Sequence, residues 1–402
     1  MSFDGRRKHI RGKTSSIAGL AAFVTGAVLI VAGCSSGSGA SKPKTAADAG
    51  KTTTVSISLT PQGCQPKPAS VTAGDVQFNV TNSDASAVSE AELRTGDGSK
   101  ILGEQENLTP GLSGGFELTI QPGTYEINCP GASQQHWTFK VTGKTSGASW
   151  PSNPQLTAAV SGYQSYINQN TTELVSSSQT FCKAVDAGHL AQAKILYPKT
   201  RVYYERIEPV AEIWGSLDTE IDGRWENPVT TASQFIGFHR LEQLMWSSNT
   251  LSGAPALCAG LVQHEQQLLT LVKSASYNPL EMASGATDLI NEAATAKISG
   301  EEERYSNTDL PVFKANVDGA MEVVSLLTPY LQKKDPSLLT QINTQHAAVM
   351  KQLSQYQASP GYDDTGYVEY STVLDSGRRQ LSGSVNALAE ALSKVSVQVG
   401  AA

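Results

Sequence analysis

The most informative stretch of the sequence reads Gly237-Phe238-His239-Arg240-Leu241-Glu242-Gln243-Leu244-Met245-Trp246. Its apolar residues recur at helical spacing, which predicts an amphipathic helix. On such a helix His239 and Glu242 are i, i+3 neighbours and share one face. An imidazole and a carboxylate beside apolar surface in a helical bundle are typical of iron and similar metal sites. Because H-x-x-E also occurs by chance, a salt-bridged core histidine is the alternative.

The rest of the chain beyond residue 154 has the same helical texture. Apolar residues recur at spacings of three, four and seven, as in Leu261, Leu268 and Val272, and again in Leu388, Leu392 and Val395. The alternation that is typical of strands is missing here. The pattern predicts several long antiparallel helices, which form an all-α bundle over residues 154–398.

Carboxylates precede the His239 segment in two groups. If Tyr203 to Glu212 forms a helix, then Glu205, Glu208 and Glu212 stand at i, i+3 and i+7 on one face. Like charges stacked in this way need compensation, and a bound cation would supply it. The alternative is a solvated face that Arg201 and Arg206 neutralise. Pro209 is expected to kink this helix, and Asp222 lies in the loop-like acidic stretch 217–224 that follows.

Residues 53–143 alternate between apolar and polar side chains, as strands do. The clearest examples are 55–59, 76–80, 116–120 and 137–141, and turn sequences containing Gly or Pro separate them. Short alternating strands at this spacing predict a β-sandwich. The polar segment 35–52 reads as a flexible tether, and 144–153 reads as a linker between the two domains.

The N-terminus has the features of a secretory signal over residues 1–34. A basic segment precedes the apolar run from Ile17 to Ala32, and small residues follow it. The sequence around Cys34 resembles a bacterial lipobox, although Val31 stands where Leu is preferred, so Cys34 is the expected lipidation site. An uncleaved membrane anchor is the alternative. Either reading places the protein outside the cytoplasm, anchored to the membrane.

Charge and cysteine usage agree with an exported metal-binding protein. The net charge is -7, and residues 1–13 hold five basic residues against one acidic residue, so the remainder is more acidic still. Phosphate would repel such a surface, which argues against nucleic acid as a partner. Apart from Cys34, two cysteines fall in each domain, which in an oxidising compartment suggests the disulfides Cys64–Cys129 and Cys182–Cys258.

The segments around His239 resemble the imelysin family, and within it the EfeO branch of iron uptake lipoproteins. The resemblance rests on the G-x-H-x-x-E motif at 237–242, on 204–212, on 221–224 and on 298–310, in matching order and spacing. It implies an all-helical domain that binds iron, as Fe²⁺ or Fe³⁺, and partners that include a membrane permease and a haem-dependent peroxidase. The ligands we expect are His239, Glu242, Glu205 and Asp222, with Glu208 and Glu212 as weaker candidates. Asn307 departs from the family pattern, where histidine is expected.

The β region resembles the cupredoxin-like domain that longer members of this branch carry. A blue-copper centre needs two His, one Cys and a weak Met ligand, whereas residues 53–143 contain only His136 and no Met. Electron transfer through such a centre is therefore not expected. A different site, for iron or copper, would use Glu92, Glu126, Cys64 and Cys129, unless the two cysteines form a disulfide.

Three functions follow from these patterns, and the preferred one is non-enzymatic. It is an extracytoplasmic lipoprotein that binds iron and delivers it to a permease. The first alternative is a metallopeptidase, but the zincin pattern H-E-x-x-H begins at His264-Glu265 and fails at Leu268. The second alternative is a copper-dependent redox module that acts on iron. Iron binding through an imidazole should weaken as the pH falls through about 6.5, the reference pKa of histidine.

Overall fold

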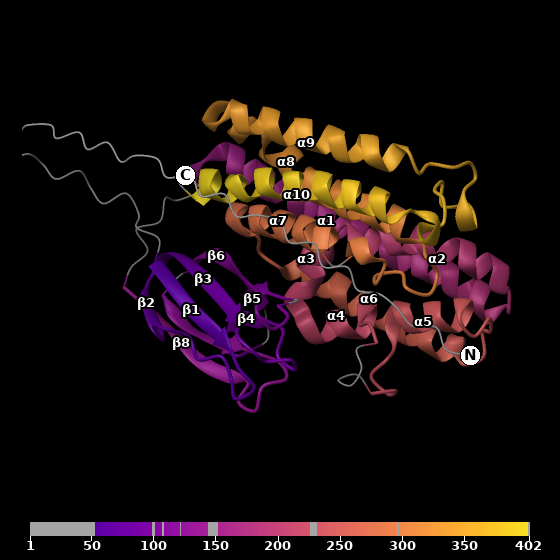
Figure 1. Ribbon diagram of the computed structural model, residues 1–402, viewed down its shortest axis with the longest axis horizontal. Coiled ribbons are helices and arrows are strands. Elements are labelled where there is room, and N and C mark those ends of the chain that lie inside the picture. Colours follow the sequence, from indigo (N-terminus) through magenta and orange to yellow (C-terminus); the bar gives the residue numbers. More distant parts are fainter. Residues whose placement is uncertain are drawn as a thin grey trace, which may run out of the picture. The chain divides into compact units, whose positions relative to one another are not determined.

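Eight strands form the N-terminal domain of this computed structural model, which describes residues 53–98, 101–106, 108–120, 122–143, 152–225, 231–295 and 297–400. One sheet has the order β1-β3-β6 and the other β2-β8-β7-β4-β5, shown in indigo and purple in Figure 1. The predicted β-sandwich is confirmed. The strands are β1 Thr53–Leu59, β2 Ser70–Thr72, β3 Gly74–Asn82, β4 Ala91–Thr95, β5 Ile101–Gln105, β6 Ser113–Ile120, β7 Gly123–Asn128 and β8 His136–Thr142.

Alternation of side chains explains why these segments fold as strands. In β1, Val55, Ile57 and Leu59 are buried while the residues between them are exposed. They pack against Phe78 and Phe139, whose rings meet edge to face at 5.5 Å between centroids. β1 and β3 run parallel, and β3 pairs antiparallel with β6. The apolar residues that the sequence predicted as strand cores therefore lie between the two sheets.

The C-terminal domain is helical, as predicted, and its long helices lie side by side in Figure 1. Its apolar core runs through all the long helices. In the part of the chain that the structure describes, no helix has both the length and the apolar content to cross a bilayer. The helices are α1 Pro154–Asp186, α2 Leu190–Glu205, α3 Glu208–Ala211, η2 Glu212–Trp214, α4 Gly215–Asp222, α5 Gly237–Trp246, α6 Ala254–Ser274, α7 Pro279–Thr295, η3 Lys297–Ser299, α8 Asp309–Lys334, α9 Pro336–Ser354, η4 Tyr362–Asp364, η5 Tyr370–Thr372 and α10 Asp375–Gly400.

The described residues contain two disulfides, and these are the two pairs that the sequence suggested. Cys64 is bonded to Cys129 in the β domain, and Cys182 of α1 is bonded to Cys258 of α6. The predicted signal segment, the tether 35–52 and the lipidation site Cys34 lie outside the described residues, as does most of the linker 144–153.

Glu265 is a buried acid in the interface between α6 and α1. Its side chain is fully buried, and the Ser178 hydroxyl donates a hydrogen bond to Oε1 at 2.6 Å. Burial raises the pKa of Glu265 well above its usual value, and the Ser178 hydrogen bond only partly opposes this. Glu265 therefore stays protonated in the folded protein at a pH where it ionises in the unfolded chain.

Glu265→Gln is therefore expected to stabilise the protein at neutral pH but not at acidic pH. Below about pH 4.3, the reference pKa of glutamate, Glu265 is protonated in both the folded and the unfolded protein, so its raised pKa does not affect stability. Above that pH, the free energy of unfolding falls by up to about 1.4 kcal/mol per pH unit until the folded-state pKa is reached. Because the amide cannot ionise, the gain from the substitution should grow as the pH rises from 5 to 7. Urea denaturation at both pH values measures it, with Glu173→Gln on the exposed face of α1 as control. A gain that does not depend on pH would contradict an uncharged Glu265.

Candidate metal centre in the helical domain

A glycine at the start of α5 allows His239 to lie in the interior of the domain. Gly237, the first residue of α5, has a φ of +74°, which favours glycine. A Cβ atom at this position would lie 2.2 Å from the carbonyl oxygen of Ile221. Only glycine therefore lets the start of α5 approach the end of α4 so closely. That approach sets His239 of α5 beside Asp222, the last residue of α4.

Glu242 orients the imidazole of His239. Its Oε2 lies 3.1 Å from His239 Nδ1, and the backbone N–H groups of Tyr305 and Ser306 donate to its Oε1 at 2.9 and 2.7 Å. Both side chains are almost fully buried. A carboxylate held in this way fixes the ring and favours a proton on Nδ1, which leaves Nε2 free to bind a metal. The structure thus gives Glu242 a positioning contact with His239, whereas the sequence predicted a direct ligand.

Two carboxylates face the free nitrogen of His239. Nε2 lies 3.4 Å from Asp222 Oδ1 and 3.6 Å from Glu302 Oε1, and it has no hydrogen-bond partner among the described residues. One atom from each of these three residues falls within 4.8 Å of the other two. Ligands about 2.0–2.2 Å from a common ion are themselves about 3–3.5 Å apart, so the spacing suits a small metal ion.

The electrostatics of these groups reflect burial next to opposite charge. Burial alone would lower the pKa of His239, but Asp222, Glu242 and Glu302 raise it to about 10. Burial raises the pKa of Asp222 to about 7, against the opposing effects of Arg201 and His239. An ion that binds Nε2 at neutral pH must therefore displace a proton. We expected iron binding to weaken as the pH falls through about 6.5, which is the reference pKa of histidine. The raised pKa of His239 shows that this reference value does not apply in the buried site.

Arg201 lies at the centre of the buried carboxylates. Its guanidinium contacts Asp222 and Glu205, and it donates to Glu302 and Glu303 at 2.7 and 2.9 Å. The side chain is fully buried and also lies over the ring of Phe238, 5.1 Å from its centroid. Protein cations therefore compensate much of the negative charge that we expected a metal to balance. Among the described residues, six carboxylates face three permanent cations and His239, whose raised pKa keeps it protonated at neutral pH. The carboxylates are Glu205, Glu208, Asp222, Glu242, Glu302 and Glu303, and the permanent cations are Arg201, Lys297 and Arg224.

The acidic run 205–212 is not the single helix that we predicted. α2 ends at Glu205, and Ile207 adopts φ −119° and ψ 5° before α3 begins at Glu208. Pro209 sits in the first turn of α3, where a missing N–H is tolerated, so the chain breaks before the proline rather than kinking at it. Glu205 and Glu208 are buried, whereas Glu212 lies in η2 and is partly exposed. The part of the acidic run that carries Glu205 and Glu208 is therefore buried, whereas the alternative reading expected a solvated face.

The stretch around Asp222 was also predicted wrongly, because it is helical. α4 spans Gly215–Asp222 and ends where Gly223 donates its N–H to the carbonyl of Thr219. Asn307, where the family pattern led us to expect histidine, has a positive φ of 56°. Its backbone N–H donates to the Glu303 carbonyl at 2.7 Å, which closes the turn that follows the run Glu301-Glu302-Glu303. Glu302 is the ligand candidate that sequence reasoning missed, although the run Glu301-Glu302-Glu303 was part of the family resemblance.

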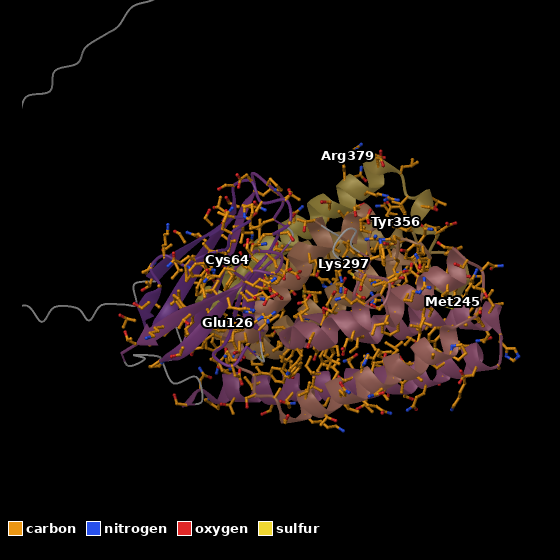
Figure 2. The ribbon with its side chains drawn as sticks, turned by 90° about the horizontal axis from the view of Figure 1, so that it is seen from below. Cys64, Glu126, Met245, Lys297, Tyr356 and Arg379 are labelled. Atoms are coloured by element: carbon orange, nitrogen blue, oxygen red, sulfur yellow. A yellow bond between two sulfur atoms is a disulfide. The ribbon has the colours of Figure 1, made fainter. Side chains whose placement is uncertain are left out.

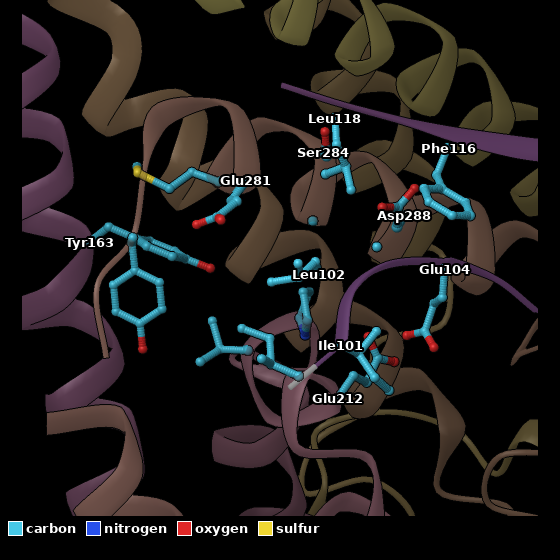
Figure 3. A pocket seen from close by; sticks show the side chains of 17 residues that line it. Ile101, Leu102, Glu104, Phe116, Leu118, Tyr163, Glu212, Glu281, Ser284 and Asp288 are labelled. Atoms are coloured by element: carbon cyan, nitrogen blue, oxygen red, sulfur yellow. The ribbon is translucent and has the colours of Figure 1, made fainter. Parts of the chain in front are cut away.

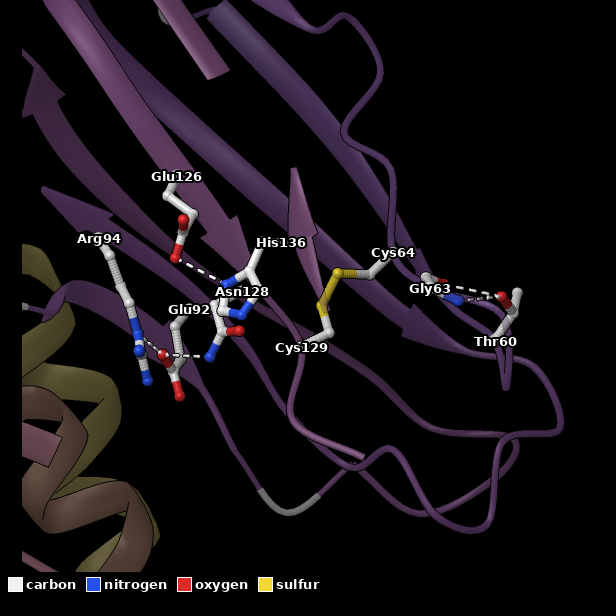
Figure 4. Close-up of a disulfide and its surroundings, with 9 residues drawn as sticks. All are labelled: Thr60, Gly63, Cys64, Glu92, Arg94, Glu126, Asn128, Cys129 and His136. Carbon is white, nitrogen blue, oxygen red and sulfur yellow. Dashed lines mark hydrogen bonds and ion pairs between the residues drawn. A yellow bond between two sulfur atoms is a disulfide. The ribbon is translucent and has the colours of Figure 1, made fainter. Parts of the chain in front are cut away.

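The site suggested in the β domain looks different in the structure (Figure 4). Cys64 and Cys129 form a disulfide, and a disulfide does not offer thiolate ligands. Glu92 accepts hydrogen bonds from Arg94 and Asn128, while Glu126 Oε1 lies 2.9 Å from His136 Nδ1. Among the residues that the structure describes, no cluster with metal-binding spacing includes any of these side chains.

A separate pocket has a mostly apolar lining (Figure 3). Leu102, Phe116 and Leu118 of the strands line it, together with Tyr163 and Met282. Glu212 is the one predicted ligand in its lining. His239, Asp222 and Glu302 are not part of this pocket, so the candidate metal centre is a distinct, buried feature.

Family models match both domains of the chain. The family model described as Imelysin matches residues 159–395, and the model of the cupredoxin-like domain matches residues 26–138. The chain belongs to the imelysin family. It is 34% identical over 345 residues to the protein named iron uptake system component EfeO from Escherichia coli K12, which covers 85% of this chain and 90% of that protein. EfeO from Shigella flexneri matches equally well.

A solved structure shows the same helical fold at low sequence identity. It comes from Parabacteroides distasonis and bears the name of an iron-regulated protein A precursor. The match has a TM-score of 0.50 and 15% identity, and it covers 63% of this chain and 97% of that one. At this identity the likeness concerns the fold alone.

Proposed function

We propose that this imelysin-family protein binds one iron ion in its helical domain as cargo and delivers it to a membrane permease of an iron uptake system. The similarity to EfeO over 85% of the chain supports a role in iron uptake. The finer elements of the proposal are a lipid anchor at Cys34, an extracytoplasmic location and a haem-dependent peroxidase as a second partner.

One observation carries the choice of site. His239 Nε2 is buried, has no hydrogen-bond partner among the described residues, and faces Asp222 and Glu302 at 3.4 and 3.6 Å. A buried polar atom without an aligned hydrogen bond is costly, and an ion bound between Nε2 and the two carboxylates would satisfy all three groups. Imidazole with carboxylates suits Fe²⁺ and Fe³⁺. We therefore assign His239, Asp222 and Glu302 as ligands and Glu242 as the residue that orients His239.

The alternatives have less support. For a peptidase, the partial zincin pattern would need Glu265 to act on a metal-bound water, yet Glu265 is buried against Ser178 in a different part of the domain. For a copper redox module, the described β-domain residues offer one imidazole and disulfide-bonded cysteines. Both features favour binding over catalysis.

Glu302→Gln is expected to reduce the stabilisation that iron gives the protein. Iron at 100 times its dissociation constant should stabilise the wild type by about 2.7 kcal/mol, which appears as a higher melting temperature. The amide keeps the shape of the side chain but loses its charge, so the shift at the same iron concentration should fall by more than half. Glu301→Gln is the matched control, because the adjacent Glu301 side chain is 62% exposed and pairs with Arg304 at the surface. Equal iron-induced shifts in the two variants would remove Glu302 from the site.

A further inference from the structure

Lys297 is a second buried cation, and it lies apart from the His239 centre. It begins η3, its side chain is 1% exposed, and it lies within the helical domain in Figure 2. Its Nζ donates to Glu205 Oε2 at 2.9 Å and to both carboxylate oxygens of Glu208 at 2.5 Å. Glu302 Oε2 lies 3.9 Å away. Three carboxylates thus surround one ammonium group, much as they would surround a metal ion.

The carboxylates around Lys297 belong to a chain of three groups. The first is the His239 centre with Asp222 and Glu302, and the second joins Glu302 to Glu205 and Glu208. The third joins Glu208 to Glu212 and Glu292, both of which are partly exposed. Because Glu302 and Glu208 are each shared between neighbouring groups, the chain is continuous from the partly exposed end to the buried histidine. Lys297 occupies its middle position.

Asn316 borders the same position from α8. This α8 side chain is fully buried, and its Nδ2 donates to Glu205 Oε2 and Glu208 Oε2, each at 3.0 Å. Its Oδ1 has no hydrogen-bond partner among the described residues. The nitrogen also donates to the Glu205 carbonyl oxygen at 3.1 Å, and a rotation of the amide by 180° would exchange these three hydrogen bonds for an oxygen that faces the position between the carboxylates. Amide oxygen and carboxylate oxygens are ligands that hard cations prefer.

We propose that Lys297 is an internal cation that occupies a second metal position, formed by Glu205, Glu208, Glu302 and Asn316, and thereby limits the buried chain to one metal ion. The inference rests on the proposed function for the identity of the metal, iron. The ammonium group carries a positive charge where an ion would bind. Because it is attached to the chain, it occupies this position without the entropy loss that a free ion incurs on binding. It also separates the His239 centre from the partly exposed Glu212 and Glu292.

Lys297→Met tests this inference, because methionine is close to lysine in length and carries no charge. Full-length protein is loaded with Fe²⁺ under nitrogen, passed over a desalting column, and analysed for iron per chain. We expect one ion in the wild type and two in Lys297→Met. Lys314→Met is the control, because Lys314 pairs with Asp318 on a partly exposed face of α8 and should leave the count at one. The double variant Lys297→Met, Glu208→Gln should return the count to one.

The outcomes separate this inference from the proposed function. No iron in the wild type but one ion in Lys297→Met would refute the His239 site and still support the role of Lys297. An unchanged count in folded Lys297→Met would overturn the inference, whatever the wild type binds. If the variant is unfolded without metal, iron should restore its circular dichroism and add one ion beyond the wild-type count. Failure of iron to restore the fold would contradict the inference.

Discussion

Replacing Arg201 with leucine is expected to lower the free energy of unfolding by about 3–5 kcal/mol at pH 7. The guanidinium is fully buried and contacts Glu205, Asp222, Glu302 and Glu303. Leucine would leave these carboxylates without their main partner. A buried charge that lacks a partner has lost its hydration and gains no ion pair or hydrogen bond to offset that loss. The destabilisation should be smaller at pH 5, where protonation of the carboxylates relieves their repulsion.

Chemical denaturation of the wild type and Arg201→Leu measures this effect. Arg206→Leu is the matched control on the same stretch of chain, because Arg206 is about one-third exposed and lies 3.8 Å from Asp318. We expect the control to change stability by less than about 1 kcal/mol, as for exposed ion pairs. Similar effects of the two substitutions would show that Arg201 does not compensate the buried carboxylates.

Much of the fold follows from local patterns in the sequence. Alternation in 55–59 and 76–80 marks β1 and β3, because one face of each strand is buried. The helical period likewise marks the bundle. The two errors were the break at Ile207, inside a stretch predicted as one helix, and the helix α4, predicted as a loop. Helix ends depend on capping and tertiary contacts, which a hydrophobic period does not contain.

Spacing alone predicts the candidate site only where its residues are close in sequence, whereas the choice of Asp222 came from the family resemblance. The i, i+3 spacing places His239 and Glu242 together, and the structure confirms that they share α5. Glu302 reaches His239 from 63 positions further along the chain, through tertiary packing that spacing cannot reveal. Neutralisation by Arg201 was weighed as the alternative, but the burial of Arg201 and the part played by Lys297 were missed for the same reason. Their charges are visible in the sequence, but their burial is not.

The second large effect concerns iron affinity. His239→Ala is expected to weaken iron binding by about 100-fold or more, because loss of a metal ligand should exceed the 10–100-fold cost of losing an outer-shell partner. Glu242→Gln should fall within that smaller range, since Glu242 acts on the ion through the orientation of the His239 ring. Both variants should keep the helical content of the wild type.

Calorimetric titration of the wild type and His239→Ala with Fe²⁺ under nitrogen is the most direct test of the central claim, that this domain holds iron at His239. His346→Ala, which changes a partly buried histidine of α9, is the control. We predict a single site in the wild type and in His346→Ala, and a loss of affinity of about 100-fold or more in His239→Ala. Equal affinities in all three proteins would contradict the account and would move the search to the carboxylate group of Glu208, Glu212 and Glu292.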